Sequence, residues 1–244
     1  MQNTDILILG AGISGLLCAT ELRRSGYRVR VLDKGRGPGG RMSTRRMGGG
    51  RLDHGAQYFT VRDARFREYV DEWLAAGVIR EWFRHLPEDS NPEGYPRYRG
   101  TAGISDVAKH LADGLDVRRG ERAVSVTRGM DGWAVQTEAG ATYEGAWLVA
   151  TPPLPQTLTL LDSAGLDYAN GRRAELAAVG YEKGLATLAI LDGPSGLPEP
   201  GGLKVENAPP LTWIADNRMK GISESVTAVT LHADAAFAAA HWDT

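Results

Sequence analysis

The stretch Asp5-Ile-Leu-Ile-Leu9, followed directly by Gly10-Ala-Gly-Ile-Ser-Gly15, decides the fold of this 244-residue chain. The continuous apolar run at residues 6–9 is typical of a strand that is buried on both faces of a parallel sheet. The glycines have the spacing Gly-x-Gly-x-x-Gly, and the pattern of residues 14–24 predicts a helix after them. A strand, a glycine-rich turn and a helix in this order predict a site for a dinucleotide.

Each glycine of this turn has a separate physical task. Gly10 allows the tight turn, Gly12 lets a diphosphate approach the main chain, and Gly15 lets the helix pack closely on the strand. The N–H groups of the first helical turn, at Ile13 and Ser14, then face the phosphates. The alternative is an ordinary glycine-rich turn, but the strand before the motif and the helix after it favour a nucleotide.

An acidic residue follows at the expected distance. Asp33 lies 18 positions after Gly15, at the end of a second apolar strand, residues 28–32. The right-handed crossover rule places this strand beside the first. Asp33 is therefore predicted to accept hydrogen bonds from the hydroxyl groups of a ribose, and Lys34 beside it is included among the cofactor-binding residues.

A second glycine cluster indicates which dinucleotide is bound. Gly37, Gly39 and Gly40 come soon after Asp33, and Arg36 and Arg41 flank them. A unit that binds a nicotinamide nucleotide normally enters its next helix here. A glycine-rich loop with arginines instead favours a long ligand with two phosphates, held by guanidinium groups. The other arginines of this region are expected to lie in a solvated loop.

Two segments then carry a family resemblance. Gly39-Gly-Arg-Met-Ser-Thr44, followed by Asp53-His-Gly-Ala-Gln-Tyr-Phe59, resembles the renalase-like branch of the flavin amine oxidase superfamily. The resemblance implies FAD as the cofactor, with Gln57 and Tyr58 in contact with the flavin. The alternative for these two residues is a plain strand with a buried tyrosine.

The middle of the chain predicts a small antiparallel insertion. Residues 123–127 and 133–137 alternate in polarity around a glycine-containing turn, which is typical of a hairpin. The resemblance implies a three-stranded meander here, with the residue at Val124 meeting the adenine through its main chain. Residues 146–150 predict a buried strand, so Thr151 at its end is expected to reach the ligand crevice.

The second half of the chain has a different pattern. Strands are predicted at 184–191, 211–215 and 225–232, a loop at 193–210, and helices at 156–161, 172–179 and from 235. Thr212–Asn217 and Leu231-His232 extend the resemblance. Trp213, His232 and Tyr58 are candidate substrate residues. Trp213 could equally be a buried core aromatic, and His232 reads better as a hydrogen-bonded strand histidine.

The fold class expected is α/β: a Rossmann-like FAD/NAD(P)-binding domain with an inserted β-meander, plus an α+β substrate domain. We assign residues 1–75 and 100–158 to the first domain, and 76–99 and 159–244 to the second. In the family resembled, a later Gly-Asp turn and a closing helix complete the flavin site. Because no such motif follows residue 151, the chain is expected to lack the C-terminal part of the family.

Composition narrows the function classes. With 28 basic and 30 acidic residues the net charge is −2, which gives no electrostatic case for nucleic acid or an anionic membrane. The single cysteine, Cys18, excludes an internal disulfide and a cysteine-based metal cluster. No apolar run is long enough to span a membrane, and residues 1–5 do not resemble a secretory signal, so we expect a cytoplasmic protein without a metal site.

The function expected is that of an FAD-dependent oxidoreductase. The resemblance implies a small reduced substrate, an isomeric dihydronicotinamide dinucleotide, which gives up a hydride, and oxygen as the acceptor. Hydride loss makes that ring aromatic, so no catalytic residue is named. Two alternatives stay open: a flavin amine oxidase or desaturase, and a truncated nucleotide-binding protein without catalytic activity.

Overall fold

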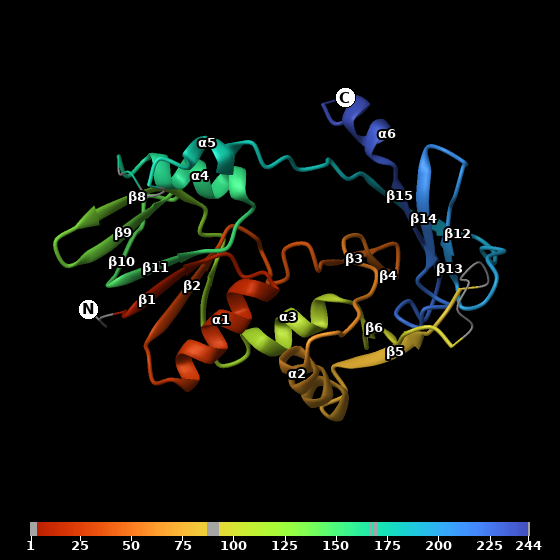
Figure 1. Cartoon of the computed structure of the whole chain (residues 1–244). Coiled ribbons are helices and arrows are strands. Elements are labelled where there is room, and N and C mark those ends of the chain that lie inside the picture. Colours follow the sequence, from red (N-terminus) through yellow and green to blue (C-terminus); the bar gives the residue numbers. More distant parts are fainter. Residues whose placement is uncertain (1–3, 87–92, 166, 168–169, 244) are drawn as a thin grey trace. The chain divides into compact units, whose positions relative to one another are not determined.

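The computed structural model describes residues 4–86, 93–165, 167 and 170–243. The chain divides into two compact units by its internal contacts. The first unit comprises Met1–Gly40 and Ala108–Tyr181, and the second comprises Arg41–Val107 and Glu182–Thr244. Each unit is described by itself below (Figure 1).

The first unit is built on a four-stranded sheet of parallel strands in the order β11-β1-β2-β7. The predicted strand, helix and second strand are confirmed, since α1 connects β1 to β2 and buries Gly15, Leu16 and Ala19. The elements are β1 (Ile6–Leu9), α1 (Ile13–Arg24), β2 (Val29–Asp33), β7 (Asp116–Arg119) and β11 (Trp147–Ala150).

The predicted meander is confirmed as a second sheet of the same unit, with the order β10-β9-β8. Two further helices follow it in the chain, and Ser163 at the end of the first of them accepts a hydrogen bond from Val126 N at 2.9 Å. The elements are β8 (Ala123–Gly129), β9 (Gly132–Thr137), β10 (Thr142–Gly145), α4 (Leu154–Asp162) and α5 (Arg173–Ala177). A core of apolar side chains joins the two sheets and α4: Leu7, Leu9, Leu32, Val126, Val135 and Leu160.

The second unit contains an antiparallel sheet in the order β12-β15-β14-β13. A short helix, α6, follows the sheet, and Asp234 caps it by accepting a hydrogen bond from Phe237 N at 2.7 Å. The elements are β12 (Ala186–Leu191), β13 (Gly202–Lys204), β14 (Leu211–Asp216), β15 (Thr227–Ala233) and α6 (Ala235–Ala240).

Two hairpin-like strand pairs and one helix complete the second unit. The helix α2 begins after Asp63, which caps it by accepting a hydrogen bond from Arg65 N, and it buries Val70 and Trp73. A third helix, α3, passes from this unit into the first. The elements are β3 (Thr44–Met47), β4 (Gly50–Asp53), α2 (Ala64–Ala75), β5 (Ile79–Phe83), β6 (Arg97–Gly100) and α3 (Ser105–Ala112).

Three local predictions were wrong in part. The strand at 146–150 is an edge strand, and Trp147 on it is 67% exposed, because nothing described pairs with its outer side. The loop at 193–210 contains β13, which pairs with β14 and is too short to show a period. The connection predicted at 86–98 ends in β6, where Tyr98 is buried, and its residues 87–92 lie outside the described part.

The fold class is as predicted, a Rossmann-like α/β unit with an inserted meander and an α+β unit. The predicted domain of residues 1–75 and 100–158 was defined by cofactor binding, whereas the two units are defined by internal contacts. The domain assignment therefore stays a prediction. No helix in the described part of the chain has both the length and the apolar character needed to cross a membrane.

Candidate functional site

The turn after β1 is shaped by the absence of side chains. Gly10 has a φ of +99°, and a Cβ added there would lie 2.6 Å from Thr151 Oγ1. A Cβ on Gly15 would lie 2.0 Å from the carbonyl oxygen of Gly10, so only glycine lets α1 begin this close to the strand. Both glycines are therefore required by the fold.

Gly12 differs from its two neighbours in the motif. A Cβ added at Gly12 would meet nothing within 4 Å, so open space adjoins this residue. Gly12 is also the N-cap of α1 and provides no side-chain cap, and no acidic residue lies in the first turn. The N–H groups of that turn, including those of Ile13 and Ser14, are thus available to an anion. The glycine that the fold does not need borders the space where a diphosphate is expected.

The second glycine cluster folds back onto the first within the same unit. Gly39 N donates to the carbonyl oxygen of Ala11 at 2.8 Å, and Gly12 and Gly39 form an isolated β-bridge. Gly40 has a φ of +55°, and a Cβ there would lie 3.6 Å from Gly12 Cα. Two stretches of bare main chain therefore lie side by side, as a cradle for a phosphate group requires.

Asp33 stands at the end of β2 and is held by the main chain. Its Oδ2 accepts a hydrogen bond from Ala11 N at 2.6 Å, and its Oδ1 accepts one from Gly35 N at 2.6 Å. The sequence pattern did not reveal these two bonds, which fix the carboxylate against the first glycine turn. Each carboxylate oxygen can accept a second bond, so hydroxyl groups of a ribose can still be accommodated.

The basic residues near the cradle are exposed. Lys34 Nζ donates to Gln156 Oε1 at 3.4 Å, and the side chain of Arg36 is exposed. Arg41 opens the second unit with an exposed side chain, and its carbonyl oxygen accepts a hydrogen bond from Ala56 N at 2.9 Å. The same carbonyl explains Gly55, because a Cβ there would lie 2.0 Å from it. The phosphate contacts of these cations stay predictions.

Val124 and Thr151 also belong to the first unit. The register of β8 against β9 shifts between Ala123 and Ser125, so Val124 is the extra residue of a bulge and its main chain is freed from the ladder. Thr151 follows β11, and its hydroxyl donates to the carbonyl oxygen of Leu9 at 2.8 Å. Thr151 thus lies at the carboxyl ends of adjacent parallel strands, where ligands bind in such sheets.

The other predicted residues meet one another inside the second unit. Gln57 Nε2 donates to the carbonyl oxygens of Asp53 at 2.6 Å and Gly55 at 3.2 Å, and it lies 3.4 Å from His232 Nε2. His232 is directly opposite Trp213 in the pairing of β14 with β15, so both side chains project from the same face. Burial lowers the pKa of His232, although its hydrogen bond to the main chain of His54 opposes the shift, so the ring is neutral near pH 7.

Aromatic rings surround Tyr58. Its ring centroid lies 6.4 Å from Trp82, 5.6 Å from Phe83 and 5.7 Å from Trp213, each in an edge-to-face arrangement. We call these four residues the ring cluster. Arg97 lies over the Tyr58 ring at 5.6 Å, and Lys220 lies over the Trp82 ring at 4.7 Å. Tyr58, Trp213 and His232, the three candidate substrate residues, thus lie close together with Gln57.

A buried ion pair adjoins the ring cluster. Lys220 Nζ lies 2.7 Å from Asp53 Oδ2, and both side chains are fully buried. Asp53 also accepts hydrogen bonds from Thr44 Oγ1 at 2.6 Å and Ile104 N at 2.9 Å. Burial lowers the pKa of Lys220, while the carboxylate of Asp53 raises it.

The same network reaches the strand that carries His232. Asn217 Oδ1 accepts from Asp53 N at 3.2 Å, and Asn217 Nδ2 donates to Thr230 Oγ1 at 3.0 Å. Sequence reasoning missed Lys220, Asn217 and Trp82, because their partners are far away in the chain. The signal available in the sequence was Lys220 itself, a lysine in a segment whose pattern otherwise predicts a turn.

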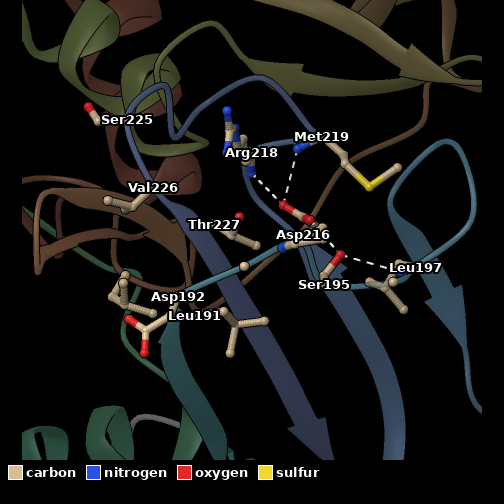
Figure 2. A pocket seen from close by; sticks show the side chains of 14 residues that line it. Leu191, Asp192, Ser195, Leu197, Asp216, Arg218, Met219, Ser225, Val226 and Thr227 are labelled. Carbon is tan, nitrogen blue, oxygen red and sulfur yellow. Dashed lines mark hydrogen bonds between the residues drawn. The ribbon is translucent and has the colours of Figure 1, made fainter.

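An open pocket of about 800 Å³ lies elsewhere in the second unit (Figure 2). Asp216 borders it, but its carboxylate is already occupied: Oδ1 accepts from Arg218 N at 2.8 Å and Met219 N at 3.1 Å, and Oδ2 accepts from Ser195 Oγ at 2.6 Å. None of the predicted site residues lines this pocket. We read Asp216 as a residue that holds the turn after β14, and we assign no chemistry to the pocket.

Across the described ranges, His, Cys, Asp and Glu side chains do not gather in groups of three or more that could hold a metal ion. The two regions offer main-chain donors, the carboxylates of Asp33 and Asp53, the imidazole of His232, the amide of Gln57 and aromatic rings.

Comparison with known proteins identifies related sequences. Residues 8–73 match the family described as NAD(P)-binding Rossmann-like domain. Renalase from Mus musculus is 27% identical over 187 residues, which is 72% of this chain and 55% of that protein. Rifampicin monooxygenase from Rhodococcus hoagii is 26% identical over 70% of this chain and 36% of that protein. The chain thus spans about half the length of the renalase and about a third of the monooxygenase.

Solved structures share the fold. A putrescine oxidase mutant has a TM-score of 0.77 at 14% identity, covering 99% of this chain and 78% of that one. A CLA-producing fatty acid isomerase from P. acnes has a TM-score of 0.71 at 13% identity, covering 96% of this chain and 77% of that one. At these identities the likeness concerns the fold alone.

Proposed function

We propose that this chain is a renalase-like member of the flavin amine oxidase superfamily and an FAD-dependent oxidoreductase. The similarity to a renalase and the Rossmann-like match of residues 8–73 support this proposal. The observation that carries the proposal is the cradle of the first unit, where open space adjoins Gly12 at the uncapped start of α1. A related FAD-binding monooxygenase from Epichloe uncinata supports FAD as the cofactor.

The residues present fit the adenine half and the diphosphate of FAD. The N–H groups at Ile13 and Ser14 would face the diphosphate, with the bare main chain of Gly12 and Gly40 beside them. Asp33 would accept from the ribose, and the bulge at Val124 would offer its main chain to the adenine. A bound flavin would supply the acceptor for a hydride, and oxygen is the electron acceptor that we propose.

The second unit would hold the substrate against Tyr58, Trp213 and His232, with Gln57 at the same place. We propose as the substrate a small reduced molecule, an isomeric dihydronicotinamide dinucleotide, because hydride loss from its ring needs no protein base. The charges around the ring cluster favour it over an amine. Arg97 lies over the Tyr58 and Phe83 rings, and its positive charge would repel a protonated amine.

Titration with FAD tests the cradle. Asp33→Ala should weaken FAD binding about tenfold to a hundredfold, since a hydrogen bond to a charged group contributes about 1.5–3 kcal/mol. Asp131→Ala, in the exposed turn between β8 and β9 of the same unit, is the matched control and should leave the dissociation constant unchanged. Equal titration curves for the wild type and Asp33→Ala would show that the cradle is misplaced.

Anaerobic reduction of the FAD-loaded protein tests the substrate. The dihydronicotinamide isomers should bleach the flavin absorbance, whereas primary amines such as putrescine should not. Bleaching by amines alone would replace the proposed activity with amine oxidation. A preparation that stays colourless after reconstitution with FAD would favour a nucleotide-binding protein without redox activity.

A further inference from the structure

Two buried polar atoms, one in the ring cluster and one in the adjacent Gln57, lack a hydrogen-bond partner within the described part of the chain. They are the oxygen Oε1 of Gln57 and the nitrogen Nε1 of Trp213. A buried polar atom left in this condition destabilises a fold by about 1–3 kcal/mol. Such atoms in a protein interior call for an explanation, and a bound molecule is one.

The orientation of the Gln57 amide is fixed. Its Nε2 donates to two carbonyl oxygens, those of Asp53 and Gly55. Rotating the amide by half a turn would place Oε1 against the Asp53 carbonyl oxygen in place of the donor, where two acceptors would repel. Gln57 therefore presents an acceptor, and only an acceptor, to its remaining surroundings.

Trp213 presents the complementary group, as a comparison with its neighbour Trp82 shows. The indole N–H of Trp82 donates to the carbonyl oxygen of Pro200 at 3.0 Å, so that ring is satisfied by the fold. Trp213 packs 6.3 Å from Trp82, but its own N–H is not used. Gly202 leaves room for both rings, since a Cβ there would lie 3.1 Å from Trp213 and 3.3 Å from Trp82.

The lone acceptor and the lone donor belong to one group of residues. Gln57 Nε2 lies 3.4 Å from His232 Nε2, and His232 is opposite Trp213 in the sheet. Tyr58, next to Gln57 in the chain, contacts the Trp213 ring. We propose that Gln57 Oε1 and Trp213 Nε1 bind the edge of a planar amide, with Gln57 accepting from its N–H and Trp213 donating to its carbonyl oxygen.

The pair selects against charged groups. A carboxylate has no proton to give to Gln57, and an ammonium group has no acceptor for the indole N–H of Trp213. Within the proposed function, on which this inference rests, two molecules carry such an edge. One is the pyrimidine ring of the flavin, and the other is the carboxamide of a nicotinamide dinucleotide.

Matched tryptophan variants test the pair. Trp213→Phe removes an N–H that the described fold does not use, whereas Trp82→Phe removes one that the fold does use. The three proteins are titrated calorimetrically with FAD, with oxidised nicotinamide adenine dinucleotide, and with its nicotinic acid analogue, which has a carboxylate in place of the carboxamide. Thermal melts accompany each titration.

Trp213→Phe should keep the melting temperature of the wild type. It should lower, about tenfold, the affinity for the ligand whose amide the pair holds. Trp82→Phe should melt earlier, and any change in its ligand affinities should be the same for the carboxamide and the carboxylate. Loss of FAD affinity assigns the pair to the flavin. Loss of the dinucleotide affinity, together with loss of a wild-type preference for carboxamide over carboxylate, assigns it to the substrate.

If Trp213→Phe binds both ligands as tightly as the wild type does, the inference is overturned. The indole N–H of Trp213 would then face an aromatic ring or a buried water molecule. If Trp213→Phe does not fold, the wild-type preference decides: equal affinity for the carboxamide and the carboxylate, with FAD binding unaffected by Gln57→Met, overturns the pair. A wild type that fails to bind FAD contradicts the proposed function instead, and the dinucleotide arm still tests the pair.

Discussion

The cradle of the first unit and the ring cluster of the second unit prepare for a ligand in opposite ways. The cradle is made of residues without side chains, and its one important side chain, Asp33, is held by two main-chain N–H groups. The ring cluster is made of large side chains over a buried ion pair. The comparison teaches that one region depends on local backbone conformation and the other on contacts that are distant in the sequence.

The largest effect is expected from the buried ion pair. Lys220→Met would leave Asp53 buried without its cation, and breaking such a pair typically destabilises a protein by about 3–5 kcal/mol. Lys204→Met is the control, because Lys204 pairs with Glu206 on the surface and should contribute at most about 1 kcal/mol. Urea unfolding followed by tryptophan fluorescence measures both. A loss below 1 kcal/mol for Lys220→Met would show that the ring cluster does not depend on this pair.

The cradle provides a pair of glycines that separates folding from binding. Gly15→Ala should lower stability by about 1–3 kcal/mol, because its Cβ would overlap the carbonyl oxygen of Gly10. Gly12→Ala should change stability by less than about 1 kcal/mol, since its Cβ would enter open space, yet it should weaken FAD binding. Thermal melts and FAD titrations of both variants measure this contrast. Equal losses of stability would mean that Gly12 is also required by the fold.

The smallest effect concerns the start of α2, outside both regions. Arg65, by its side chain and its main-chain N–H, lowers the pKa of Asp63 from 3.8 to about 2. A carboxyl group whose pKa is lowered on folding stabilises the fold above its unfolded pKa, and this contribution is lost as the pH falls from about 4 to about 2. Asp63→Asn keeps a capping side chain but cannot titrate. The difference in melting temperature between the two proteins should therefore shrink across that pH range, and a constant difference would contradict the assignment.

The cradle was predictable because its signals are local. The spacing of Gly10, Gly12 and Gly15 after an apolar strand, and the position of Asp33, follow from one strand-helix-strand connection. The separate tasks predicted for the glycines agree with the structure, since the fold requires Gly10 and Gly15 whereas open space adjoins Gly12. The sequence did not show that Asp33 is held by Ala11 N and Gly35 N.

The ring cluster was predicted only in part, since Tyr58 and Trp213 were candidate substrate residues together with His232. Tyr58, Trp213 and His232 each had a bland alternative, and periodicity gave no reason to place them together. The hydrogen-bonding and ionic contacts that organise them join residues far apart, such as Asp53 with Lys220 and Gln57 with His232. Strand pairing between β14 and β15 sets which of these side chains share a face, and a shift by one residue would reverse it.

The sequence by itself determined the order of strand, turn and helix, the fold class and the place of the glycine cradle, because short-range backbone preferences and apolar periodicity encode them. Only the tertiary structure decided which lysine is buried, and that an amide oxygen and an indole N–H without a partner in the described part of the chain lie in the same group of residues. Those facts depend on long-range packing, and no local pattern of residues records it.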